Sequence, residues 1–297
     1  MIKPDRPMFV FILGVHRSGT SCLAGALERC GLFLGPVSQR ALRDPDGFLY
    51  EHEEAVRIHS RILAANGGTW YRPPARIVID QRTKTKIRKI AQQLSRHVPC
   101  GLKDPRLLLL LDAWTETVGS WALVGTFRHP ASVVRSLLRR TPGLVEEMAW
   151  EMWSAYNEQL VRWHRANPFP IIEFDLGDSE AYCRAVAAAA MDLGLSPDMA
   201  SLREFVRPQL LGREGGDEPT PEPCREVYAY LKEHRYWPPE ADDEFQERLA
   251  MAERGYTGWR WSPDRVRKTL HPIARLVPSP LLSLGRTWFR RLDPRWR

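Results

Sequence analysis

The sequence predicts a single α/β domain with a central parallel sheet flanked by helices and a helical C-terminal part. Three observations indicate this class. Four short apolar runs alternate with longer amphipathic segments, as strands and helices do in parallel sheets. A glycine-bearing turn follows the first run and opens a helix. After about residue 195 the apolar runs stop, and helical and loop-rich sequence follows.

The elements follow in order from the apolar periodicity. Buried strands are expected at residues 8–14, 98–103, 121–127 and 170–174. Helices are expected at residues 20–30, 51–65, 82–97, 107–118, from Pro130 onward, 143–166 and 178–193. Gly31 stands where the first helix should stop, and Pro130 takes the first helical position that proline favours.

The positive charge lies at one end of the chain. The 297 residues hold 43 Lys and Arg against 36 Asp and Glu, a net charge of +7. Nine of those basic residues and one acidic residue fall in 265–297, so residues 1–264 are close to neutral. We therefore expect a domain over 1–264 and a basic tail over 265–297, with no nucleic-acid partner. Leucines and Trp288 lie among the tail arginines as in a helix on an anionic membrane surface; a helix packed on the body, or a loose basic end, is the alternative.

The cysteines and the N-terminal sequence bear on the compartment. Five cysteines are scattered without C-x-x-C or zinc-finger spacing, which supports neither a disulfide framework nor a structural zinc site. The apolar run 8–13 is too short for a signal peptide, and no run of 18 apolar residues could span a bilayer. We expect a cytoplasmic protein, peripheral at the inner membrane face if the tail binds lipid.

The turn at residues 14–21 has the design of an anion-binding loop. It joins a strand to a helix, so its backbone N–H groups and the helix N-terminus would face a bound phosphate. Gly14 and Gly19 have the spacing of the nucleotide-binding P-loop G-x-x-x-x-G-K-[ST], but Thr20 occupies the lysine position and the cation moves to Arg17. No apolar strand ending in a magnesium-binding Asp is evident. The loop should therefore hold a phosphate-like group without the metal that NTP hydrolysis requires.

These residues resemble the sulfotransferases that use 3′-phosphoadenosine-5′-phosphosulfate (PAPS). The family's first motif, R-S-G-T-[ST], stands here at residues 17–21. The resemblance implies a P-loop-like fold with PAPS as co-substrate and no metal. It places the 5′-phosphosulfate on His16, Arg17, Ser18, Gly19, Thr20 and Ser21.

A second family motif, an arginine at a strand end with a serine eight residues later, stands here as Arg128 and Ser136. In the family this pair binds the 3′-phosphate, and an arginine fork at a strand end suits a phosphate on chemical grounds as well. The similarity covers roughly residues 8–235 and leaves out the tail.

Two further segments supply candidate catalytic residues. The family's N-P-x-G-[FYW]-x-E loop is approximated at 44–51, where Asp44 stands in place of Asn and two residues separate Phe48 from Glu51, and K-D-P-R stands at 103–106. Glu51 is the expected general base, at the opening of a helix, with His52 as the fallback; the alternative for Glu51 is a solvated first-turn carboxylate. By resemblance Lys103 touches the sulfuryl group, and its alternative is an ion pair with a carboxylate. Arg17 should neutralise charge on the leaving phosphate.

The sequence thus predicts a PAPS-dependent enzyme that sulfates a hydroxyl acceptor. A carbohydrate or lipid-linked sugar is the favoured acceptor, on the layout of bacterial relatives and the basic tail. A P-loop kinase or NTPase is the first alternative, which Thr20 and the absent magnesium ligand disfavour. A non-catalytic, membrane-attached relative is the second. Trp70, after two glycines, is expected to be an exposed aromatic near the substrate.

Overall fold

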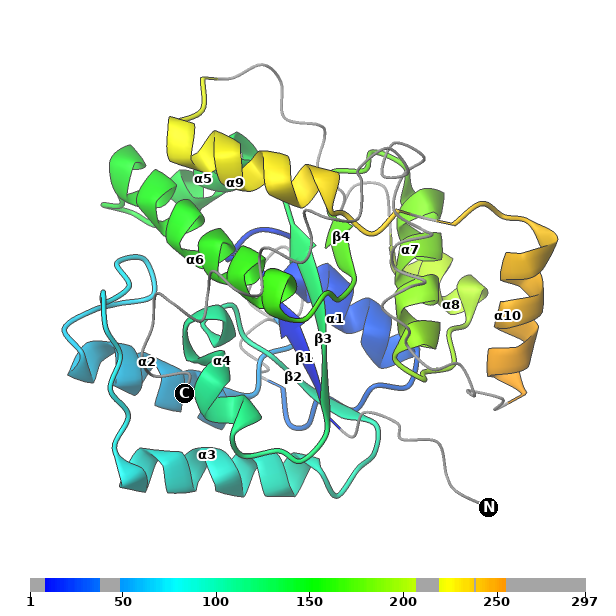
Figure 1. Ribbon diagram of the computed structural model, residues 1–297, viewed down its shortest axis with the longest axis horizontal. Helices are drawn as coiled ribbons and strands as arrows, with labels where there is room; N and C mark the ends of the chain where they lie inside the picture. Colours follow the sequence, from blue (N-terminus) through cyan, green and yellow to red (C-terminus); the bar gives the residue numbers. More distant parts are fainter. Residues whose placement is uncertain (1–8, 38–48, 207–218, 238, 255–297) are drawn as a thin grey trace, which may run out of the picture.

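A computed structural model gives the architecture for residues 9–37, 49–206, 219–237 and 239–254 (Figure 1). The predicted tail at 265–297 and the first part of the loop matched to the family at 44–48 lie outside these described residues. Within the described residues, no helix combines the length and the apolar character needed to cross a bilayer.

The centre of the molecule is a parallel sheet. In the described residues it has four strands, β1 (Phe9–Leu13), β2 (Cys100–Lys103), β3 (Trp121–Phe127) and β4 (Ile171–Glu173), in the order β2-β1-β3-β4. Every pairing is parallel, with Phe9 opposite both Cys100 and Trp121. All five residues of β1 are buried, as expected for a strand covered on both faces.

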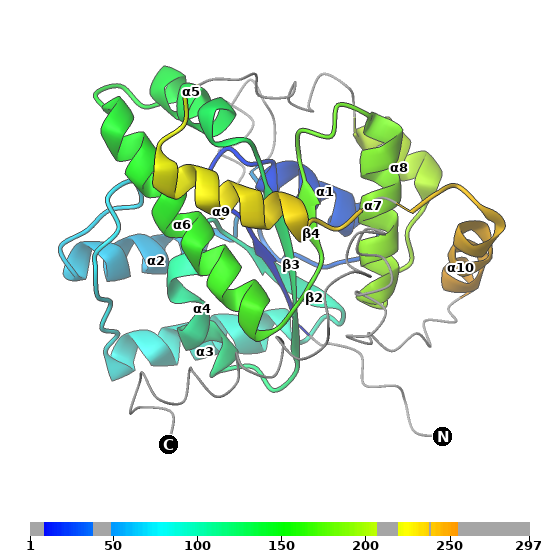
Figure 2. The same ribbon diagram turned by 45° about the horizontal axis from the view of Figure 1, so that its top comes forward.

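Helices cover both faces of the sheet (Figures 1 and 2). Val10 and Ile12 of β1 pack with one group of helices: α1 (Thr20–Arg29), α7 (Ser179–Asp192), α8 (Met199–Phe205) and α10 (Asp243–Glu253). Phe9, Phe11 and Leu13 point to the other face. They pack with α2 (Glu53–Ala65), α3 (Gln81–Leu94), α4 (Leu107–Thr115), α5 (Pro130–Arg140), α6 (Glu146–Ala166) and α9 (Glu222–Glu233).

The predicted class is confirmed, with shifts at some helix ends. Strands form at all four predicted apolar runs, and α3 and α4 each end three residues earlier than expected. The expectation that Glu51 opens a helix is wrong, because α2 begins at Glu53. His52 is its N-cap, since His52 Nδ1 accepts a hydrogen bond from the backbone N–H of Ala55.

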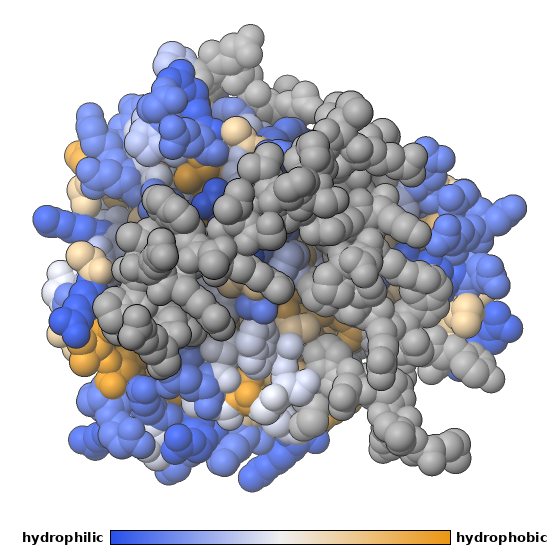
Figure 3. Space-filling model, in the orientation of Figure 1, coloured by the Kyte–Doolittle hydropathy of each residue, from blue (hydrophilic) through white to orange (hydrophobic). Residues whose placement is uncertain are grey.

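The helix α3 is the most basic of the surface helices. Arg82, Arg88 and Lys89 are exposed on it, whereas Ile87 and Ile90 are buried against the core. The lower edge of the molecule in Figure 3, where α3 lies, is accordingly hydrophilic. This division of polar and apolar residues is what makes an exposed helix pack by one side only.

Candidate active site

The loop between β1 and α1 has the backbone geometry of a phosphate-binding turn. Gly14, Arg17 and Gly19 all have positive φ, at 154°, 68° and 86°. Ser18 is fully buried and holds the turn together, because its Oγ donates to the carbonyl of Val15 at 2.6 Å. The loop is also tied to the sheet. A hydroxyl on β3, Thr126 Oγ1, donates to the Ser18 carbonyl at 3.2 Å.

Gly19 is required at the N-terminus of α1 for two reasons. Its φ of 86° lies in the left-handed region that favours glycine. A Cβ at this position would also collide with the ring of Phe174, which follows β4. The loop at residues 14–21, called the phosphate loop below, therefore packs against the residue that follows β4, and β4 lies two strands away from β1 in the sheet.

Arg17 and Ser136, predicted from separate motifs, are brought together by the fold. Arg17 Nε donates to Ser136 Oγ at 3.0 Å, although 119 residues separate them in sequence. Ser136 lies on α5 and is 4% exposed. The cation of the phosphate loop and the serine of the second motif thus border the same position.

Arg128 stands at the end of β3 and is held by Asp175, which follows β4. Arg128 Nε donates to Asp175 Oδ1 at 2.9 Å, and the backbone N–H of His129 donates to Oδ2 at 3.1 Å. Burial raises the pKa of the Asp175 carboxyl, against the opposing effect of Arg128. The guanidinium carbon of Arg128 lies 5.5 Å from the ring centroid of Phe174. Through Phe174, Arg128 is linked to Gly19 and the phosphate loop.

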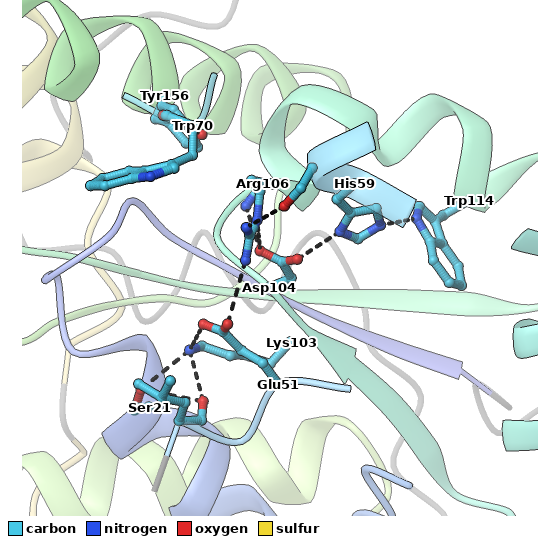
Figure 4. A network of polar contacts seen from close by, with 11 residues as sticks. Ser21, Glu51, His59, Trp70, Lys103, Asp104, Arg106, Trp114 and Tyr156 are labelled. Atoms are coloured by element: carbon cyan, nitrogen blue, oxygen red, sulfur yellow. Dashed lines mark hydrogen bonds and ion pairs between the residues drawn. The ribbon is translucent and has the colours of Figure 1, made fainter. Parts of the chain in front are cut away.

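Lys103 and Glu51 form a buried ion pair at the same loop (Figure 4). Lys103 Nζ lies 2.8 Å from Glu51 Oε1, and the two side chains are 2% and 12% exposed. Lys103 Nζ also donates to Ser21 Oγ at 3.2 Å and to the Leu49 carbonyl at 2.8 Å. The ion pair that sequence reasoning gave as the alternative for Lys103 is present, with Glu51 as its carboxylate.

The second oxygen of Glu51 faces a chain of buried polar groups (Figure 4). Glu51 Oε2 is 3.5 Å from Arg106 Nη2, and Arg106 Nε donates to Asp104 Oδ1 at 2.8 Å. Asp104 Oδ2 is 2.7 Å from His59 Nδ1, and Trp114 Nε1 donates to His59 Nε2 at 2.8 Å. Burial tends to raise the pKa of Asp104, but Arg106 and His59 hold it well below its usual range.

His52, the fallback base, faces a different part of the molecule. It is 5% exposed, its Nδ1 caps α2, and its ring packs where a Cβ on Gly35 would lie. Burial lowers its pKa. The contacts of His52 in the described residues are thus those of a helix cap. They do not include the Lys103–Glu51 pair.

His16 packs against two aromatic side chains, Trp70 and Tyr156. Its ring centroid is 4.6 Å from that of Trp70 and 5.7 Å from that of Tyr156. Burial, together with Arg106, lowers the pKa of His16 to about 3, so the imidazole is neutral. Its buried Nε2 has no hydrogen-bond partner among the described residues. Trp70 is half-buried against this ring, and not the freely exposed aromatic that its glycine neighbours suggested.

Tyr50 is a positioning residue that sequence reasoning missed. It has a φ of 53°, is 6% exposed and inserts its ring between α1 and α8. A Cβ on Gly25 would lie 2.7 Å from the Tyr50 ring and 2.5 Å from that of Phe205. Glu51 is therefore anchored by its neighbour. A tyrosine after an apolar leucine carries no sequence signal for this role, although a glycine inside a helix suggests a close approach.

Comparisons with known proteins give structural neighbours, of which two are sulfotransferase domains. No family model matches the chain, and no curated protein matches it in sequence. A solved structure described as the sulfotransferase domain from the curacin biosynthetic pathway aligns over 76% of this chain and 98% of its own, with 13% identity and a TM-score of 0.45. The sulfotransferase domain from the Synechococcus PCC 7002 olefin synthase aligns over 98% of both chains, with 16% identity and a TM-score of 0.36.

Proposed function

We propose that this protein transfers a sulfuryl group from PAPS to a hydroxyl acceptor without a metal ion. The observation that carries the proposal is the convergence of groups on one loop. Arg17 of the phosphate loop contacts Ser136, and Lys103 joins Ser21 of the same loop to Glu51. Anion-binding groups and the carboxylate of Glu51 thus meet where a strand–loop–helix turn presents its N–H groups.

The donor set suits a nucleotide with phosphates at two ends. The backbone of residues 14–21, with Arg17, would hold the 5′-phosphosulfate, and Arg128 with Ser136 would hold the 3′-phosphate. Each of these side chains ends in a donor that matches a phosphate oxygen. Arg17 touches Ser136, and Arg128 reaches the loop through Phe174, so the two sets are contiguous in the fold.

The chemical roles follow from the charges. In the proposed transfer the sulfur–oxygen bond to the leaving phosphate breaks and a bond to the acceptor oxygen forms, and the acceptor's proton passes to Glu51. Arg17 would stabilise the charge on the leaving phosphate. The three N–H donors of Lys103 already have acceptors, so contact with the sulfuryl group requires Lys103 to exchange one of them. The Leu49 carbonyl and Ser21 are the uncharged candidates for exchange.

For the acceptor, we propose a carbohydrate or lipid-linked sugar. The half-buried indole of Trp70 lies on His16 of the phosphate loop and offers a flat apolar surface beside the proposed donor site. A magnesium-dependent kinase or NTPase is the competing function, and Thr20 at the P-loop lysine position disfavours it.

The test combines a transfer assay with two matched serine variants. Incubation with PAPS and candidate sugars should add the mass of one sulfuryl group, and an excess of chelator should leave the rate unchanged. Ser136→Ala should lower the affinity for adenosine 3′,5′-bisphosphate by about 10–100-fold, as expected for the loss of one charge-assisted hydrogen bond. The affinity for adenosine 5′-phosphate should stay almost unchanged.

Ser132→Ala is the control, because Ser132 is equally buried on α5 but pairs with Arg135. Loss of activity with chelator that magnesium restores, or stabilisation by magnesium–ATP alone, would contradict the proposal. If Ser136→Ala lowers the affinity for both nucleotides equally, Ser136 acts through Arg17 and not on a 3′-phosphate.

A further inference from the structure

A row of hydrogen bonds runs from a buried tryptophan to the proposed base. Its members come from three parts of the fold: Trp114 on α4, His59 on α2, and Asp104 and Arg106 just after β2. Trp114, His59 and Asp104 are fully buried, and Arg106 is 8% exposed. Among the described residues no hydrogen bond or ion pair joins the first three to Glu51, whereas Arg106 faces it, so the side-chain route from the row to Glu51 runs through Arg106.

The tautomer of His59 follows from the chemistry of its partners. An indole nitrogen only donates, so His59 Nε2 must accept the hydrogen bond from Trp114 Nε1. His59 Nδ1 then carries the ring proton and donates it to Asp104 Oδ2 at 2.7 Å. Trp114, which only donates, and the carboxylate of Asp104, which only accepts, thus require the same tautomer of His59 and hold its ring from both sides.

Both carboxylate oxygens of Asp104 accept hydrogen bonds. With Oδ2 engaged by His59, Oδ1 accepts from the Arg106 backbone N–H at 3.0 Å and from Arg106 Nε at 2.8 Å. Ser60 Oγ accepts from Arg106 Nη1 at 3.0 Å. The guanidinium plane is held at two edges, and this directs Nη2 toward Glu51 Oε2 at 3.5 Å.

We propose that Trp114, His59 and Asp104 form a positioning relay that orients Arg106, and through it the carboxylate of Glu51 at the phosphate loop. Lys103 holds Oε1 and Arg106 faces Oε2, which fixes the carboxylate plane and leaves about two acceptor positions on Glu51 for an acceptor proton. The catalytic part of this inference rests on the proposed function. The hydrogen-bond order within the relay does not.

The experiment compares two tryptophan-to-phenylalanine variants. Trp114→Phe removes the N–H that fixes His59. Trp163→Phe is the matched control, because Trp163 is a buried tryptophan of the same core whose indole nitrogen has no hydrogen-bond partner among the described residues. Trp114→Phe should lower the rate at saturating PAPS by about 10–100-fold, as expected for a misplaced catalytic group, with little change in bisphosphate affinity. Trp163→Phe should keep the rate within about twofold of the wild type, and similar melting temperatures would separate positioning from unfolding.

A second readout needs no activity. The ¹⁵N chemical shifts of the His59 ring in the wild-type protein should show Nδ1 protonated and Nε2 unprotonated. In Trp114→Phe the Nε2 resonance should shift because this nitrogen loses its hydrogen bond, while the carboxylate of Asp104 keeps Nδ1 protonated. A protonated Nε2 in the wild-type protein, or equal rates in the two variants, would overturn the relay. If the wild-type protein transfers no sulfuryl group, the proposed function fails and the ring shifts still decide the relay. If Trp114→Phe does not fold, the wild-type shifts decide alone.

Discussion

Glu51 is restrained at both carboxylate oxygens, and this determines how it can act. Lys103 contacts one oxygen at 2.8 Å and Arg106 the other at 3.5 Å. A carboxylate with two oxygens has about four acceptor positions, so two remain for a hydroxyl proton. The paired cations fix its orientation, which is what a general base requires before its basicity matters.

Replacing Glu51 with glutamine tests this role. Glu51→Gln keeps the shape but cannot take up the acceptor's proton, so turnover should fall by about 10²–10⁴-fold. Affinity for adenosine 3′,5′-bisphosphate should stay the same or rise slightly, because a negative charge near the nucleotide is removed. Stopped-assay rates at saturating PAPS and calorimetric binding give the two quantities.

His52→Asn is the companion variant. Asparagine is a good N-cap, so α2 should survive the loss of the imidazole. We expect a rate within severalfold of the wild type. An inactive His52→Asn with an active Glu51→Gln would reverse the assignment, and two active variants would move the acceptor site elsewhere.

At the scale of elements, the segment before α2 packs against α1 at a position where α1 has a glycine. Gly25 of α1 leaves room for the Tyr50 ring, and Arg29 on the same helix lies 3.7 Å from the Phe205 ring centroid on α8. The segment that ends at Glu51 is thereby attached to the helix that begins at the phosphate loop. A shift of α1 would move both parts of the proposed site.

Gly25→Ala tests this attachment, because its expected effect on stability is opposite to the one that helix propensity predicts. In a free helix alanine is about 1 kcal/mol more favourable than glycine. Here the added methyl group meets two rings, so the melting temperature should fall and the transfer rate should drop by about tenfold or more. Adding Tyr50→Asn should recover only part of the stability, since asparagine tolerates the positive φ but the Phe205 ring still meets the added methyl group, and it should not recover the rate. A Gly25→Ala enzyme as stable and active as the wild type would show that Tyr50 does not anchor Glu51.

Local patterns predict the elements well and their ends less well. The four predicted runs become β1 to β4, because a short, largely apolar run between turns is typical of a strand that helices cover on both faces of a parallel sheet. The start of α2 could not be read from spacing, since the histidine cap depends on one hydrogen bond to Ala55. Helix ends are set by such single contacts, and periodicity does not record them.

At the scale of the whole molecule, buried neutral histidines should make the fold sensitive to acid. His164 on α6 is 5% exposed, and burial lowers its pKa to about 4, with a smaller effect of His234. The unfolded chain protonates this group near its ordinary value of about 6.5, so the unfolded state binds more protons between those two values. Stability from His164 is therefore complete above about pH 6.5 and decreases as the pH falls toward 4.

His164→Gln should remove this dependence. At pH 5 the wild-type protein should have lost about 2 kcal/mol of unfolding free energy through His164 relative to pH 7.5. The variant should show a shallower decrease, not a flat one, because burial also lowers the pKa of His16 and His129. Urea unfolding at the two pH values measures both proteins. An equal decrease in unfolding free energy between pH 7.5 and pH 5 in the two proteins would mean that His164 titrates alike in the folded and unfolded chains.

Residue pairs across the molecule show where sequence reasoning ends. Both sequence motifs could be recognised, but the contact between Arg17 and Ser136 depends on how α5 packs beside the loop. The Trp114–His59 bond likewise joins residues 55 positions apart that carry no shared pattern. Motifs indicate which residues take part, whereas tertiary packing decides which of them meet.

The strand order has a consequence for how such a protein could diversify. The connection after β1 turns into α1 on one face of the sheet, and the connection after β3 turns into α5 on the other. Open parallel sheets hold ligands at the point where neighbouring connections diverge in this way. The place of the proposed anion site is thus set by chain topology, before any side chain is chosen. Segments outside the two connections, such as the one bearing Trp70, do not set this position, so the same proposed donor site is compatible with different acceptors.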